Sequence, residues 1–190
     1  MKNNILKSTL VVVLAVTLAS FTTISEKVVD VAKSNVTWKG YKVTGSHAGT
    51  IALSSGVLKF ESEALVGGEF SINMTTITTT DIQGEYAQKL DGHLKSDDFF
   101  GVEAFPTANI AFKSVESSGK NSYTVSADLT IKGKTNPVTF EISIYGSKAT
   151  ASLKVDRTKF DVRYGSTSFF DNLKDKAIYD EFDLVVDLQF

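Results

Sequence analysis

Strict alternation of apolar and polar residues recurs along most of the chain and limits its fold more than any other feature. Between residues 123 and 131 the odd positions, from Tyr123 to Ile131, are apolar, and the even positions are polar. Successive side chains of a β-strand point to opposite faces, so a period of two predicts a strand with one buried face. The apolar positions of the other alternating segments are Val36 and Trp38; Ile51 and Leu53; Leu58 and Phe60; Phe70, Ile72 and Met74; Ala108, Ile110 and Phe112; Val138, Phe140, Ile142 and Ile144; Ala149, Ala151, Leu153 and Val155; and Phe182, Leu184, Val186, Leu188 and Phe190.

Turn-forming residues separate these segments, because glycine, serine and asparagine tolerate the backbone angles of tight turns. The predicted turns are residues 54–56, 67–68, 117–122 and 145–147. An open sheet of so many strands would leave two unpaired edges, whereas closure removes both. The sequence therefore predicts an all-β fold, an antiparallel barrel of about eight strands.

One segment breaks the alternation. Tyr86, Leu90 and Leu94 are spaced four residues apart, which predicts one face of a helix. Residues 96–98, Ser-Asp-Asp, follow as a capping sequence that leads into a second short turn, with the phenylalanines at 99–100 buried behind it. We expect this short helix to cap one end of the barrel.

The first 25 residues have a different character. Lys2 and Lys7 precede ten predominantly apolar residues, 10–19, and small polar residues follow. This arrangement is typical of a secretory signal peptide, and the apolar run is shorter than the roughly 20 residues of a membrane-spanning helix. We predict that residues 1–25 are a signal peptide, cleaved between Ala19 and Ser25, and that the protein is periplasmic or secreted. A permanent anchor is the alternative.

Composition limits the partners of the mature chain, residues 26–190, which is long enough for one domain. The sequence has no cysteine, which removes disulfides and also a lipid-attached export signal, so we expect no stable membrane anchor after cleavage. Loss of Lys2 and Lys7 leaves 18 basic against 22 acidic side chains and changes the formal net charge from −2 to −4. Nucleic acid is therefore not an expected partner. No sequence pattern marks an interface, so homodimerisation stays open.

Four stretches of this chain match a known signature. They are Gly92-His-Leu-Lys-Ser-Asp-Asp-Phe-Phe100 with its continuation to Phe112, residues 127–140, Asp156-Arg157 with residues 160–162, and Trp38-Lys-Gly40 with His47-Ala-Gly49. Taken together, and in their order along the chain, they resemble the YceI-like family of polyisoprenoid-binding proteins. The resemblance implies an extended lipocalin-like barrel with a helical cap. It also implies an elongated lumen that holds an isoprenoid chain, such as a polyprenyl phosphate or a quinone.

The apolar faces have two interpretations. An eight-stranded barrel is just wide enough to be filled by its own side chains or to hold one small ligand, and alternation alone favours a filled core. The family resemblance favours a ligand, and burial of each methylene contributes about 0.8 kcal/mol. The predicted ligand-binding residues are Trp38, Phe70, Ile72, Met74, Phe112, Leu129, Ile131, Phe140, Ile142 and Arg157.

A polar head group on the ligand would need hydrogen-bond donors at the mouth of the barrel. The candidate donors are Lys42, His47, Arg157, Lys159, Arg163 and Tyr164. Arg157 ranks first, because arginine matches phosphate oxygens with two parallel hydrogen bonds. The alternative is that it pairs with an aspartate such as Asp156 or Asp161.

Few residues could carry catalysis. His47 and His93 are isolated, which makes a poor metal site, and the neighbouring Asp97 and Asp98 would diverge rather than converge on one substrate. The chain has no cysteine and no Gly-x-Ser-x-Gly motif. We therefore predict a binding protein without enzymatic activity, metal or cofactor.

The alternative function is that of a structural or stress-related barrel module that binds a protein partner through its loops. Phe169 and Phe170 are adjacent within residues 164–173. An exposed apolar patch there would mark such a surface.

Overall fold

The computed structural model describes residues 23–190. The predicted signal peptide, residues 1–25, lies outside this range except for its last three residues. The elements in chain order are β1 (Ile24–Val28), β2 (Asn35–Lys42), β3 (Gly45–Glu61), β4 (Ala64–Thr79), α1 (Glu85–Lys95), β5 (Thr107–Gly119), β6 (Ser122–Ile131), β7 (Lys134–Tyr145), β8 (Lys148–Asp156), the 3-10 turns η1 (Arg157–Phe160) and η2 (Lys174–Lys176), and β9 (Ile178–Gln189).

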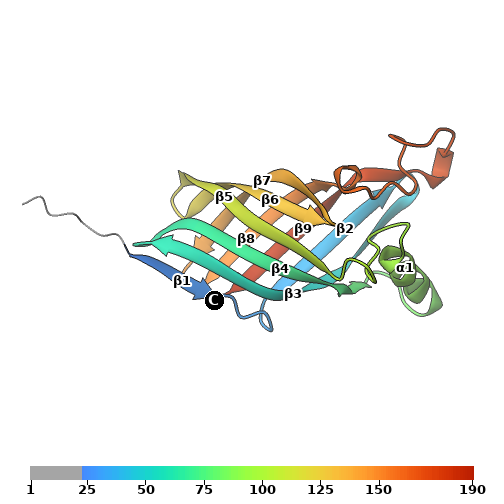
Figure 1. The fold of residues 1–190 in the computed structure, drawn as a ribbon. Helices are drawn as coiled ribbons and strands as arrows, with labels where there is room; N and C mark the ends of the chain where they lie inside the picture. Colours follow the sequence, from blue (N-terminus) through green and yellow to red (C-terminus); the bar gives the residue numbers. More distant parts are fainter. Residues whose placement is uncertain (1–22) are drawn as a thin grey trace, which may run out of the picture.

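Strands β2 to β9 form an elongated closed barrel (Figure 1). Each strand pairs antiparallel with the next along the chain, including β4 with β5 on either side of α1, and the barrel closes where β2 pairs antiparallel with β9. The predicted antiparallel barrel of eight strands is confirmed. Closure satisfies the backbone groups that an open sheet would leave unpaired.

The strand β1 was not predicted. It pairs with the second half of β3, from Val28 opposite Val57 to Ile24 opposite Glu61, beyond the point where β2 ends. All five of its residues are exposed, so it lacks the buried face that alternation reveals. It begins two residues before the predicted start of the mature domain at residue 26.

Two predicted turns are wrong. Residues 54–56 and 67–68 lie inside the long strands β3 and β4, and the hairpin between these strands turns instead around Ser62, which has a φ of 59°. The other two predicted turns are confirmed. The β5–β6 hairpin turns at Asn121 and the β7–β8 hairpin at Gly146, both with positive φ.

The misleading glycines provide space for aromatic rings. A Cβ at Gly56 would lie 2.5 Å from Cδ1 of Phe70, and a Cβ at Gly68 would lie 2.9 Å from Cε2 of Phe112. Both separations are far below van der Waals contact. Glycine here serves packing inside the barrel rather than chain reversal.

The helix α1 caps one end of the barrel (Figure 1), as predicted. Leu94 is buried and Leu90 half-buried, but Tyr86 is 77% exposed. The predicted apolar face is therefore wrong at its first residue. Asp91 joins the helix to the barrel by accepting hydrogen bonds from the backbone N–H of Thr79 and the hydroxyl of Thr78.

The segment after α1 folds back under the cap. Ser96 ends α1: its backbone N–H donates to the carbonyls of Gly92 and His93. A short turn follows, and Phe99 and Phe100 are buried as predicted. These two rings line the end of the barrel that lies next to α1.

Candidate ligand-binding cavity

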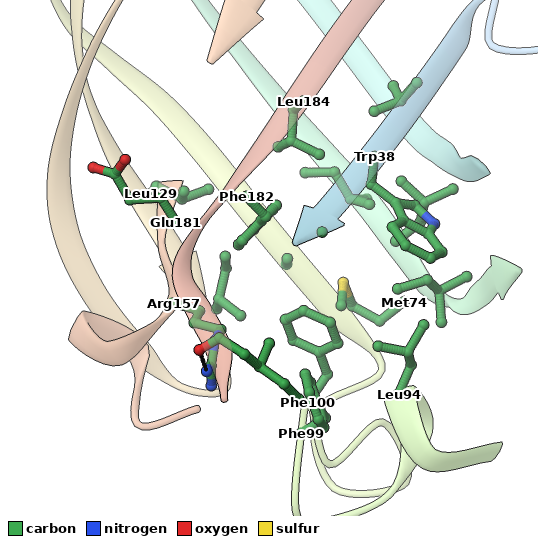
Figure 2. A pocket seen from close by; sticks show the side chains of 18 of the residues that line it. Trp38, Met74, Leu94, Phe99, Phe100, Leu129, Arg157, Glu181, Phe182 and Leu184 are labelled. Atoms are coloured by element: carbon green, nitrogen blue, oxygen red, sulfur yellow. Dashed lines mark hydrogen bonds between the residues drawn. The ribbon is translucent and has the colours of Figure 1, made fainter. Parts of the chain in front are cut away.

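A cavity lies inside the barrel against the cap (Figure 2). The volume of this cavity is about 130 Å³. Apolar cavities of a similar volume, about 150 Å³, stay dry and bind benzene. The lining residues are Val36, Trp38, Gly40, Tyr41, Ile51, Ile72, Met74, Ile77, Leu94, Phe99, Phe100, Ala108, Leu129, Ile131, Arg157, Ile178, Tyr179, Glu181, Phe182 and Leu184.

Six of the ten predicted ligand-binding residues line this cavity: Trp38, Ile72, Met74, Leu129, Ile131 and Arg157. The remaining four are Phe70, Phe112, Phe140 and Ile142. The ring of Phe112 lies 5.8 Å from that of Phe70 and 5.7 Å from that of Phe140, measured between centroids. These three rings form a cluster, named the aromatic cluster, that lies farther from α1 along the barrel than the cavity does. The barrel is thus filled at the level of the aromatic cluster and hollow next to the cap.

Small residues help to keep the cavity open. Gly40 lines it, and a Cβ built at Gly40 would meet no atom within 4 Å. Ala108 on β5 contributes only a methyl group to the wall. Larger side chains at these two positions would fill space that is now empty.

The cap and β9 supply most of the lining that the sequence did not single out. Leu94, Phe99 and Phe100 lie on the side of the cavity that faces α1 (Figure 2). Phe182 and Leu184 come from β9, where alternation had already marked them as inward-facing. Their contribution follows from barrel closure, which places β9 next to β2.

Arg157 is buried at the edge of the cavity, with 3% of its surface exposed. Its guanidinium donates to the backbone carbonyls of Tyr179 (3.0 Å), Val162 (2.8 Å) and Ile178 (3.0 Å). The carboxylate of Asp180 lies 3.7 Å away. Burial lowers the pKa of Arg157, and the charge of Asp180 opposes this shift. The side chain thus ties η1 to the start of β9. The carboxylate within 4 Å of it is that of Asp180, and Asp156, which the sequence suggested, also acts on the pKa of Arg157 but more weakly.

The other five head-group candidates do not line the cavity: Lys42, His47, Lys159, Arg163 and Tyr164. Arg163 pairs with Asp161, with 2.6 Å between Nε and Oδ1. The ring of Tyr164 packs edge-on against His93 on α1, with centroids 4.5 Å apart. Of the predicted donors, only Arg157 lines the cavity.

Both histidines contact a carboxylate outside the cavity. His47 Nδ1 lies 3.1 Å from Asp81, and His93 Nε2 lies 3.8 Å from Asp98. Neither histidine lines the cavity. Within residues 23–190, no group of three or more histidine, aspartate or glutamate side chains could hold a metal ion. In the same part of the chain, no helix is long and apolar enough to cross a bilayer.

A closed antiparallel barrel with a helical cap and an apolar interior cavity defines a class of small barrels with room for one apolar ligand. Residues 28–190 match the YceI-like domain, and the chain belongs to this family. A UPF0312 protein of Shewanella denitrificans is 31% identical over 91 residues, which cover 48% of this chain and 46% of the relative. The matched region thus spans less than half of that relative's length.

Two solved structures show the same fold. BcnA of Burkholderia cenocepacia superposes with a TM-score of 0.68 at 23% identity, over 84% of this chain and 98% of BcnA. A polyisoprenoid-binding domain from Saccharophagus degradans, implicated in plant cell wall breakdown, superposes with a TM-score of 0.60 at 13% identity, over 89% of this chain and 99% of that domain. These similarities concern the fold.

Proposed function

We propose that this protein is an exported, non-catalytic carrier that holds an isoprenoid or a similar long apolar lipid in its cavity. The observation that carries the proposal is a capped cavity walled by apolar side chains inside a closed barrel. Membership in the YceI-like family supports it, as does the fold shared with a polyisoprenoid-binding domain.

The energetics of an apolar chain fit such a site. Each methylene transferred from water into the cavity contributes about 0.8 kcal/mol, and an isoprenoid tail offers many carbon atoms. The described cavity, of about 130 Å³, takes a benzene-sized part of the tail, and burial of that part offsets the several kcal/mol lost when a flexible chain is ordered. Recognition of the tail then needs shape and apolarity, and a polyprenyl phosphate or a quinone-like molecule would both supply them.

The proposed location outside the cytoplasm rests on residues 1–25. Their basic start, apolar run and small polar end are those of a cleaved signal peptide. A periplasmic or secreted carrier would shield an apolar lipid from water between membranes. Amino-terminal sequencing of the exported protein tests this part: a start between residues 20 and 26 supports it, and retention of residues 1–19 contradicts it.

Mass spectrometry of organic extracts tests the binding proposal. Protein purified without detergent is expected to carry a co-purifying lipid. Gly40→Leu should lower the lipid content, because its side chain would extend into empty space in the cavity. Gly92→Leu is the matched control, since Gly92 is exposed on α1 and its Cβ would also meet no atom within 4 Å. Absence of lipid from the wild-type protein, or equal lipid in both variants, would contradict the proposal.

One observation favours a second candidate function, docking of a protein partner. Phe169 and Phe170 are 44% and 49% exposed in the loop between η1 and η2. A double change of both residues to serine should abolish partner capture in a pull-down while lipid content stays unchanged. Loss of lipid together with the partner would favour the carrier function instead.

A further inference from the structure

The pairing of β2 with β9, which closes the barrel, is interrupted near the cap. The two strands pair in regular register up to Gly40 opposite Phe182, but the next pair joins Lys42 to Ile178. Tyr41 on β2 therefore lies opposite the three intervening residues of β9. This irregularity is named the β2–β9 bulge. Bulges disrupt the backbone ladder locally and are frequent beside functional sites.

Arg157 holds the bulged part of β9 from the side opposite β2. Strand β8 pairs with β9 only as far as Glu181. Beyond that point the guanidinium of Arg157 donates to the carbonyls of Tyr179 and Ile178, both at 3.0 Å. These two carbonyls are thus satisfied without β2, so β9 can keep the extra residues of the bulge.

The cavity reaches the surface at the β2–β9 bulge. The lining residues that belong to the bulge and its two flanking pairs are Gly40, Tyr41, Ile178, Tyr179, Glu181 and Phe182. Within the described lining only Tyr179 and Glu181 are exposed, Tyr179 by 55%. Figure 2 shows the carboxylate of Glu181 directed away from the labelled side chains of the cap. The cavity therefore has an opening in the side of the barrel.

The half-buried side chain of Tyr41 covers this opening. Its hydroxyl donates a 2.6 Å hydrogen bond to the carboxylate of Asp183 on β9, and Nζ of Lys154 lies 3.1 Å from the other oxygen of that carboxylate. Nζ of Lys39 lies 5.3 Å from the centroid of the Tyr41 ring. Next to Tyr41, a Cβ built at Gly40 would meet no atom within 4 Å. Side-chain contacts thus connect β2 to β9 where the backbone ladder is interrupted.

The cap is a less favourable route into the cavity. Movement of α1 away from the barrel would break both hydrogen bonds that Asp91 accepts and would expose the buried side chains of Leu94, Phe99 and Phe100. Displacement of Tyr41 would break a single hydrogen bond to β9. One hydrogen bond contributes less than the burial of three large apolar side chains.

We infer that ligands enter and leave the cavity sideways, through the gap between β2 and β9 at the bulge, and that Tyr41 is the gate of this portal. The inference rests on the proposed function and adds the route by which the ligand exchanges. The cap stays in place during this exchange.

Stopped-flow fluorescence tests the route, with Trp38 in the cavity wall as the reporter. The probe is a benzoquinone with a single isoprenoid unit, which quenches the indole when it enters. Tyr41→Phe keeps the ring and removes the hydroxyl that binds Asp183. The association and dissociation rates should both rise about two- to tenfold, and their ratio should change much less than either rate. Tyr145→Phe is the control, because Tyr145 is exposed and lies outside the lining.

Asp91→Ala distinguishes the portal from the cap. The change weakens the attachment of α1 to Thr78 and Thr79 and should leave both exchange rates close to those of the wild type. Exchange that is faster in Asp91→Ala than in Tyr41→Phe would overturn the inference, because the ligand would then pass beneath the cap. Thermal unfolding of each variant shows whether it is folded.

A second measurement uses the absence of cysteine from the sequence. Tyr179→Cys and Tyr86→Cys each place one thiol at an exposed position, the first at the portal and the second on α1 outside the lining. A maleimide-linked polyethylene glycol at position 179 should slow quinone exchange by about tenfold or more, and the same label at position 86 should leave the rates unchanged. Equal rates in the two labelled proteins would overturn the inference while the carrier function stands. A wild-type protein that carries no lipid and does not bind the quinone would contradict the carrier function and the inference with it.

Discussion

The backbone N–H of Thr79, at the end of β4, donates a 2.7 Å hydrogen bond to the carboxylate of Asp91 on α1. The hydroxyl of Thr78 donates to the other oxygen of the same carboxylate at 3.0 Å. Asp91 thus attaches the helical cap to the rim of the barrel. Asp91→Ala is expected to lower the free energy of unfolding by about 1–3 kcal/mol and to increase hydrogen exchange in α1. Unchanged exchange in α1 would show that packing alone holds the cap.

The same attachment predicts a pH dependence. Burial raises the pKa of Asp91, but the hydrogen bonds from Thr79 and Thr78 outweigh this effect, so its pKa lies below the ordinary value of 3.8. The stabilisation by the ionised carboxylate is fully present above pH 3.8 and is lost as the pH falls through the lower folded value. The difference in urea midpoint between wild type and Asp91→Asn should therefore shrink in this acidic range. A difference that is constant down to about pH 2 would contradict the assignment.

Arg157 is expected to stabilise the fold. Arg157→Met would leave the carbonyls of Val162, Ile178 and Tyr179 without their donor, at a cost of about 2–5 kcal/mol in thermal or urea unfolding. Arg163→Met is the control, because Arg163 is exposed and paired only at the surface, where a loss of less than about 1 kcal/mol is expected. Equal losses in the two variants would refute the structural role of Arg157.

Two adjacent glycines of β4 should respond differently to the same change. Gly68→Ala would place a methyl group 2.9 Å from Phe112, and overpacking of this kind costs about 1–3 kcal/mol. At Gly67 the nearest atom would be 3.6 Å away, an ordinary contact, so Gly67→Ala should leave the urea midpoint nearly unchanged. A second change, Phe112→Leu, should recover part of the stability lost in Gly68→Ala.

Trp38 is the only tryptophan of the sequence and lines the cavity, so its fluorescence can report ligand binding. Because Trp38 is buried among apolar side chains, its fluorescence emission should change when a lipid enters. Titration with a prenyl quinone is expected to quench the emission, and Gly40→Leu should reduce the quenching. Equal quenching of free tryptophanamide at the same concentrations would show that the effect is not binding.

The barrel could be predicted from the sequence because the alternation of apolar and polar residues in each barrel strand shows which face is buried. Alternation placed Phe70, Ile72 and Met74 on one inward row, as they are in the structure. The sequence does not tell at which height of the barrel an inward side chain meets an opposing ring. Phe70 faces Phe112, whereas Ile72 and Met74 face the cavity. Such long-range packing decides which part of a row is core and which part is wall.

The two wrong turn predictions, in β3 and β4, both involved glycine. Glycine can form a tight turn, but inside a strand it can also leave space for an aromatic ring. Gly56 and Gly68 do the latter. Arg157 shows a similar limit. Its proximity in sequence to Asp156 suggested an ion pair, but its donors reach carbonyls more than 20 residues away at Ile178 and Tyr179.

Barrel closure affects how this protein reaches its native state. The pairing of β2 with β9 joins residues such as Thr37 and Val185, which are 148 positions apart in the chain. When two such distant residues come together, the chain loses conformational entropy before other contacts compensate for it. Topologies of this kind therefore fold slowly. The wall that holds Trp38 opposite Leu184 exists only after both ends of the chain have met. Ligand binding therefore requires that β2 and β9 have paired, because the cavity wall is incomplete until the barrel closes.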